Sequence, residues 1–250
     1  MKIKLIVLFF FLYLFSLMIT LPASTLTRFI PQSAGLKIAG VSGYAWQGEA
    51  ALLTYNKEHN FERVSWGLDW SALTTLQVKL HVKFNNGRNA MSGEGIVKSG
   101  FWGKGVENLK LDLSAAQLLS YVDLPVPIEA SGDIAITVKD ATLGDPYCAT
   151  LDGFVNWENA RISSQVGDVD LATTNINLSC ENGEPVAFIK QQSEQISSNI
   201  SALLQKGGLY KLQGTINASD KLNPDIRQAL NWIGPKDSTG ATLLNFNGRL

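Results

Sequence analysis

The chain has 250 residues, and its 21 basic residues nearly balance its 22 acidic ones, giving a net charge of −1. Binding to the phosphates of a nucleic acid requires a surplus of Lys and Arg, so this balance argues against a nucleic-acid-binding protein. Charged residues make up only 17% of the chain, so amides, hydroxyls and glycines must carry much of the polar surface.

Residues 5–21 form an apolar segment without any charged residue, and Lys2 and Lys4 precede it. A helix of this length covers about 26 Å, which is close to the thickness of the hydrocarbon core of a bilayer. The lysines favour a cytoplasmic N-terminus. We therefore expect residues 1–4 in the cytoplasm, one transmembrane helix over residues 5–21, and residues 22–250 on the other side of the membrane.

A cleaved signal peptide is the alternative to a retained anchor, because the charged start fits and Leu21-Pro22-Ala23 resembles a weak cleavage site. The apolar segment is longer than the usual signal-peptide core of about 7–15 residues, however. Leu21 also occupies a position where cleavage would favour a small residue. These features favour a retained anchor, and either outcome exports the rest of the chain.

Short segments in which apolar and polar residues alternate dominate the exported part. A period of two places apolar side chains on one face of a strand, which is typical of an antiparallel sheet. Turn sequences separate several segments, including Asn85-Asn86-Gly87 and Asn182-Gly183. We therefore predict a mainly β fold built on a curved antiparallel sheet. The alternating segments are Val78–Phe84, Leu109–Leu113, Ile134–Val138, Ile176–Cys180 and Leu244–Leu250.

Two short helices are predicted within this β-rich chain. Ser114 can cap a helix over Ala115–Val122. Asn223 can cap a second helix, which has Pro224 at its first position and ends before Gly234-Pro235.

The segment Ile196–Leu204 is ambiguous, because its apolar residues also fit helical spacing. The Gly207-Gly208 turn and the strand pattern that follows it favour a hairpin.

A stretch rich in proline, Leu124–Pro127, divides the chain near its midpoint. The segments Gly43–Gly48 and Gly153–Ala160 share glycine, tryptophan and small residues. We therefore expect two related β-rich halves, about residues 30–124 and 128–250.

Cys148 and Cys180 are the two cysteines of the chain. In an oxidising compartment they suffice for one disulfide, whereas two separate buried thiols are the alternative. The anchor already argues for export, so the disulfide is favoured. A metal site is disfavoured, because neither cysteine belongs to a C-x-x-C pair and no histidine is nearby.

No catalytic set is visible in the sequence. His59 lies in a stretch typical of an exposed turn, and His81 lies on the polar face of a predicted strand. Gly93-Glu94-Gly95 lacks the context of a phosphate-binding loop and indicates a bend in a twisted sheet. Asp168 and Asp170 lack a third ligand for a calcium ion. We expect no catalytic residue, no metal site and no cofactor.

The six tryptophans could form a stacking platform for a glycan, although tryptophans beside glycines are more often core anchors of a sheet. An exported hydrolase or glycan-binding domain would need polar residues that converge in a pocket, or a row of exposed tryptophans. We rank that class last. The tryptophans are Trp46, Trp66, Trp70, Trp102, Trp157 and Trp232.

Several segments, taken in order, carry a family resemblance. Gly40–Gly48 has the pattern Gly-x-x-Gly-x-x-Trp-x-Gly, Val64–Leu68 has Val-x-Trp-x-Leu, and Gly153–Ala160 has Gly-x-x-x-Trp-x-x-Ala. Together with the N-terminal anchor, the Asn223-Pro224 helix and Gly248-Arg249-Leu250, they resemble the protein N family of the bacterial type II secretion system.

This resemblance implies an accessory, non-catalytic component of the inner membrane. It would cross the membrane once, with its N-terminus in the cytoplasm and its C-terminal domain in the periplasm. The implied partners are other subunits of the secretion machinery. A free sheet edge would be the natural docking surface, because its unpaired backbone groups can accept a strand from a partner.

The predicted layout also resembles envelope proteins of the AsmA type, which handle lipid. In this alternative, the apolar faces of the strands would line an open groove that binds lipid. The alternation in the sequence is the same for a groove and for a filled core, so it does not separate the two functions.

Overall fold

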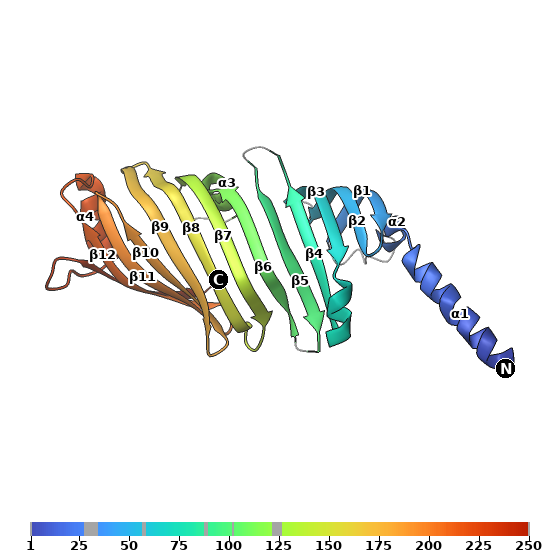
Figure 1. Cartoon of the computed structure of the whole chain (residues 1–250). Coiled ribbons are helices and arrows are strands. Elements are labelled where there is room, and N and C mark those ends of the chain that lie inside the picture. Colours follow the sequence, from blue (N-terminus) through green and yellow to red (C-terminus); the bar gives the residue numbers. More distant parts are fainter. Residues whose placement is uncertain are drawn as a thin grey trace. The chain divides into compact units, whose positions relative to one another are not determined.

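The structure is a computed structural model that describes residues 2–27, 35–56, 59–87, 90–101, 103–121 and 127–249. It confirms the mainly β, antiparallel fold with few helices (Figure 1). Strands β1 to β13 follow one another in chain order. The chain divides into two compact units, residues 1–87 and 88–250. This division does not coincide with the proline-rich midpoint, most of which lies outside the described residues. The relatedness of two halves stays a prediction.

In the part of the first unit that the structure describes, there are two helices, four strands and one 3-10 helix. Its strands form a meander in which each strand pairs with the next by backbone hydrogen bonds. The elements are α1 (Lys2–Ile19), α2 (Ala23–Leu26), β1 (Leu36–Tyr44), β2 (Gln47–Tyr55), β3 (His59–Leu68), the 3-10 helix η3 (Trp70–Thr75) and β4 (Gln77–Asn85).

The expected transmembrane helix is not found in the structure. Within the described ranges, no helix combines the length and the apolar character that crossing a membrane requires.

Glycines in the hairpin between β1 and β2 explain part of the pattern in Gly40–Gly48. Gly43 has a φ of +86°, a backbone conformation that favours glycine. A Cβ atom on Gly48 would lie 2.6 Å from the Trp66 ring, so only glycine lets that ring pack against the strand. The Trp66 indole N–H donates to the carbonyl of Ala45 at 3.1 Å. Trp66 is therefore a structural anchor of this hairpin.

The second unit contains nine strands and two helices within its described residues. Each of its strands pairs with the next in an antiparallel register. The elements are β5 (Ser92–Gly100), β6 (Gly103–Ser114), α3 (Ala115–Leu119), β7 (Ile128–Leu143), β8 (Cys148–Ser164), β9 (Gly167–Glu181), β10 (Glu184–Gln192), β11 (Ile196–Gln205), β12 (Leu209–Ala218), α4 (Pro224–Ile233) and β13 (Thr242–Arg249).

The register gives the second unit one apolar face and one polar face. Residues directly opposite each other on neighbouring strands share a face. One row across β6 to β11 is apolar and half-buried throughout, and the row beside it on the opposite face is polar from β8 to β12. The apolar row is Leu111, Ile136, Val155, Ile176, Ile189 and Ile200; the polar row is Asn156, Asn175, Lys190, Asn199 and Thr215.

One buried cluster of the second unit lies where α3 meets the apolar face. Leu113, Ala115 and Ile134 form this cluster, and Trp157 packs against them. The Trp157 indole N–H donates to the carbonyl of Ser131 at 3.0 Å. Trp157 is therefore a second structural anchor.

Both predicted helices of the second unit are confirmed, with one shorter than expected. Ser114 and Gln117 form a capping box at the start of α3, but the helix ends at Leu119, and Val122 lies outside the described residues. The Asn223 side chain accepts the backbone N–H of Asp225 and caps α4.

The predicted turns between strands are confirmed at two places. Asn182 and Gly183 both have positive φ, as a two-residue hairpin requires, and they join β9 to β10. The ambiguous segment Ile196–Leu204 lies in a strand, β11, which forms a hairpin with β12 through Gly207-Gly208. The bend predicted at Gly93–Gly95 coincides with a shift of register between β5 and β6.

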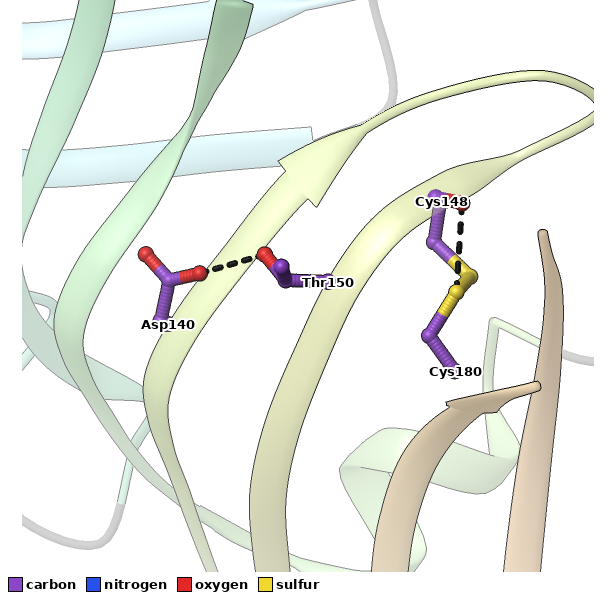
Figure 2. The surroundings of a disulfide bond; sticks show 4 residues. All are labelled: Asp140, Cys148, Thr150 and Cys180. Carbon is purple, nitrogen blue, oxygen red and sulfur yellow. Dashed lines mark hydrogen bonds between the residues drawn. A yellow bond between two sulfur atoms is a disulfide. The ribbon is translucent and has the colours of Figure 1, made fainter. Parts of the chain in front are cut away.

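Cys148 of β8 and Cys180 of β9 are joined by a disulfide, with their Cα atoms 6.2 Å apart (Figure 2). The backbone N–H of Cys148 also donates to the carbonyl of Gly183 in the turn after β9. The bridge therefore ties the start of β8 to the β9–β10 hairpin.

Replacing both cysteines by serine should lower the free energy of unfolding of the full chain by about 3–4 kcal/mol. The bridge joins residues separated by 32 positions, and its loss frees that loop in the unfolded chain. Urea unfolding with and without a reductant measures the effect. The double variant should be insensitive to the reductant, and an unchanged midpoint of the reduced native chain would contradict the role of the bridge.

Candidate docking edge and polar patch

The outer edge of β13 is the best-defined docking surface among the described residues. The strand order ends at β13, so the sheet is not closed. Only the start of this edge is covered, since Lys236 forms an isolated bridge with Thr242 and the N–H of Leu243 donates to the carbonyl of Pro235 at 2.8 Å. No further strand pairs with the edge within the described ranges.

The direction of the backbone groups along β13 follows from its first outward hydrogen bond. In an antiparallel strand the N–H and C=O of one residue point to the same side, and the side alternates along the chain. The register between β12 and β13 runs without a shift. Because the backbone N–H of Leu243 points outward, the backbone groups of Asn245, Asn247 and Arg249 also point to the free edge. These three residues are exposed. We call these three residues the docking edge.

A second feature is a polar patch on β9 to β12. It is a shallow depression of about 500 Å³ whose lining contains amides, hydroxyls and one ammonium group. Eight of its residues form two cross-strand rows on one face of the sheet. The rows are Thr173, Gln192, Ser197 and Asn217, and Asn175, Lys190, Asn199 and Thr215; we call these eight residues the polar patch.

A third feature is an ion cluster that links β5, β6 and β7. The Lys98 ammonium contacts Asp140 Oδ1 and lies 3.3 Å from Glu107 Oε1. The Thr150 hydroxyl donates to Asp140 Oδ2, as Figure 2 shows, and the Thr142 hydroxyl lies 3.4 Å from the same oxygen. The Lys98 side chain is 14% exposed and that of Asp140 is 37% exposed, so the cluster is only partly screened by water.

These contacts shift both partners toward their charged forms. The hydrogen bonds from Lys98 and then Thr150 lower the pKa of Asp140 below its ordinary value of 3.8, although burial opposes the shift. For Lys98, burial acts to lower the pKa, but the hydrogen bonds to Asp140 and Glu107 outweigh it and raise the pKa above 10.5. The sequence carried no sign of this cluster, because its members are scattered over the four strands β5 to β8.

The histidines and acidic residues considered for chemistry lie apart from these features. His59 begins β3, where its ring stacks on Tyr55, and His81 lies opposite Gly67 on β4. Asp170 lies 3.9 Å from Arg161, and Asp168 lies opposite Ser163. In the ranges that the structure describes, no group of three His, Cys, Asp or Glu side chains could hold a metal ion.

The tryptophans do not form one exposed row. Trp46, Trp66 and Trp157 are half-buried, and Trp46 stacks on Tyr44 with a ring separation of 5.6 Å. Trp70 and Trp232 are exposed, but they belong to different units. Trp102 lies outside the described residues. The polar patch contains no tryptophan, so the positions of the tryptophans in the sequence did not predict it.

Comparison with known proteins gives a consistent result over most of the chain. The family model described as "Type II secretion system (T2SS), protein N" matches residues 34–245. Three similar proteins are each named type II secretion system protein N. The protein from Vibrio cholerae is 29% identical, over 94% of this chain and 93% of its own length. The Aeromonas hydrophila protein is 29% identical over 100% of this chain and 99% of its own length. The Klebsiella pneumoniae protein is 27% identical over 95% of this chain and 92% of its own length.

No solved structure matches the chain significantly. The matching proteins are named as secretion components and none is named as a lipid-handling protein, so the AsmA-type alternative gains no support from them.

Replacing Lys98 by Met should lower the free energy of unfolding near neutral pH by about 1–2 kcal/mol, because Asp140 and Glu107 then lose the ammonium group that contacts both of them. The pKa of Asp140 is lowered in the folded chain, so its contribution is present above pH 3.8 and is lost as the pH falls through the folded pKa. Urea unfolding at a series of pH values should therefore show the difference from the wild type shrinking below pH 3.8.

The matched control is Lys139→Met, which removes an ion pair to Asp152 whose two side chains are well exposed. This control should change the free energy of unfolding by less than about 1 kcal/mol. A gap between the Lys98→Met variant and the wild type that stays constant at every pH would contradict the role of the cluster.

Proposed function

Since the chain belongs to the protein N family of the type II secretion system, we propose that it acts as an accessory, non-catalytic component of that machinery. The observation that carries this proposal is the match over nearly the whole length of the relatives, which covers both compact units. Its action consists of contacts with other subunits of the secretion system in the periplasm and the membrane. The absence of a recognised catalytic set in the sequence supports the non-catalytic assignment.

The docking edge is the surface that we assign to these contacts. Asn245, Asn247 and Arg249 offer backbone donors and acceptors in the geometry that an added strand needs. Unpaired edges are usually protected in soluble proteins by prolines, bulges or inward-pointing charges. From Leu243 to Arg249 this edge has no proline and no shift of register. A strand from another secretion subunit would complete the ladder.

Replacing Asn247 by Pro should remove the contact with the partner strand. Proline lacks the N–H that points outward here, whereas the bonds to β12 come from neighbouring residues, and an edge strand tolerates proline. Loss of one such hydrogen bond should reduce the yield of crosslinks to secretion subunits by about fivefold. Crosslinking of the full chain in cells that lack the native copy measures this, together with the amount of exported protein in the medium.

The matched control is Asn247→Thr, which also removes the amide side chain but keeps the backbone N–H. We expect crosslinks and secretion at wild-type levels for this variant. Equal loss in the two variants would assign the effect to the side chain, and no loss in either would reject the docking edge.

We further propose that residues 5–21 hold the chain in the inner membrane, with residues 22–250 in the periplasm. The segment has no charge, and several large apolar side chains of α1 are exposed, including Phe9 at 73% and Phe10 at 58%. Leaving such side chains in water is unfavourable, and a membrane would cover them.

Changing Phe9 and Phe10 together to Lys should release the chain from the membrane fraction, because each lysine at the centre of an inserted helix costs about 3 kcal/mol. A C-terminal alkaline phosphatase fusion, which is active only in the periplasm, reports the topology. An N-terminal tag reports whether the segment is cleaved. Trp232→Lys, at a site that is 87% exposed, is the matched control and should stay in the membrane. An inactive fusion, or loss of the N-terminal tag from the mature chain, would reject this topology.

A further inference from the structure

The polar patch has a composition that distinguishes it from the rest of the second unit. Lys190 provides the one charged group among the eight residues of the polar patch, and the other seven side chains are amides or hydroxyls. None of the eight side chains forms a side-chain hydrogen bond or an ion pair with another described residue. The sheet therefore presents a dense set of donors and acceptors that its own fold does not use.

The register gives this set a regular spacing. Asn175, Lys190, Asn199 and Thr215 lie directly opposite one another on four successive strands, and a second row lies two residues away along the strands. Neighbouring strands are about 4.8 Å apart, and residues two positions apart on one strand are separated by about 7 Å. A ligand that lies across the strands therefore meets a polar group at each strand.

The chemistry of the patch selects among ligand classes. An acyl chain or an apolar helix would bury these donors and acceptors without replacing their hydrogen bonds to water, which is costly. A nucleic acid would require several cations, and the patch has one. Amides and hydroxyls suit a ligand that carries many hydroxyl and acetamido groups. The single ammonium of Lys190 suits a carboxylate on that ligand.

An exposed aromatic ring lies beside the patch. Phe188 is 39% exposed and precedes Lys190 by two residues on β10, so both side chains project from the same face. The apolar face of a sugar ring can pack on such an aromatic ring, while the hydroxyls at the rim of the sugar reach neighbouring amides. Asn177 and Ser201 lie directly opposite Phe188 and extend the polar surface around it.

We propose that the polar patch binds a glycan strand that is N-acetylated and carries carboxylate groups. Amides of the patch hydrogen-bond its hydroxyl and acetamido groups, Lys190 pairs with a carboxylate, and Phe188 packs on a sugar ring. This site is separate from the docking edge, because it uses β9 to β12 and not the outer side of β13. Loss of one function would therefore leave the other intact.

The test uses the purified full chain in detergent micelles. The probe is a peptide-free glycan of alternating N-acetylglucosamine and N-acetylmuramic acid, of which the second sugar carries a carboxylate. Chitin oligosaccharide of matched length is the neutral comparison. Isothermal titration should show binding of the first probe, with about tenfold weaker binding of chitin, since one charge-assisted hydrogen bond is lost.

Two variants assign the binding to the patch. Lys190→Gln should weaken binding of the carboxylated glycan about tenfold and leave chitin unaffected. Asn199→Leu, which places an apolar side chain within the depression, should weaken both probes. Lys110→Gln is the matched charge control, because Lys110 is also exposed on the same face but lies on β6, and it should bind like the wild type.

Urea unfolding of each variant establishes that the sheet is intact before its binding is compared. The proposal is overturned if the carboxylated glycan does not bind the wild type, or if Lys190→Gln and Asn199→Leu bind it as tightly as the wild type does. Equal affinity for the two probes in the wild type would also overturn the pairing of Lys190 with a carboxylate.

Discussion

Backbone pairing between strands that are neighbours in the sequence is the constraint on which the rest of this structure depends. Each unit is a meander, so short turns such as Asn182-Gly183 fix the register of the strands that they join. Because residues directly opposite each other share a face, the register extends each row of apolar or polar side chains from one strand to the next. An apolar row with Ile136 and Ile176 and a polar row with Asn175 and Lys190 are two consequences of the same pairing.

The same pairing gives the second unit two surfaces of different kinds. A meander has a last strand, and the outward groups of Asn245 and Asn247 on β13 remain without a backbone partner within the described residues. In the polar patch, it is side chains instead of backbone groups that make no such bond within the described residues. The edge suits a protein strand and the face suits a polar polymer, so two different ligands can bind to one sheet without competing for the same atoms.

A disulfide and an ion cluster link strands of the meander in addition to the backbone hydrogen bonds between them. The disulfide of Cys148 and Cys180 fastens the start of β8 to β9 (Figure 2). The ion cluster around Asp140 joins β5, β6 and β7 through side chains. A sheet of this type has a small buried core, which here includes Leu113 and Ile134. Cross-links therefore contribute a larger share of its stability than they would in a protein with a thick core.

The sequence by itself determined the fold class, both helix starts at Ser114 and Asn223, and the family, because alternation, capping residues and motifs are local patterns. It did not reveal the pairing of Lys98 with Asp140 or the assembly of the polar patch from four strands. Asn175, Lys190, Asn199 and Thr215 are each an ordinary polar residue on a strand. Only the tertiary register, which depends on every turn between them, brings them into one row and leaves Asn247 at a free edge.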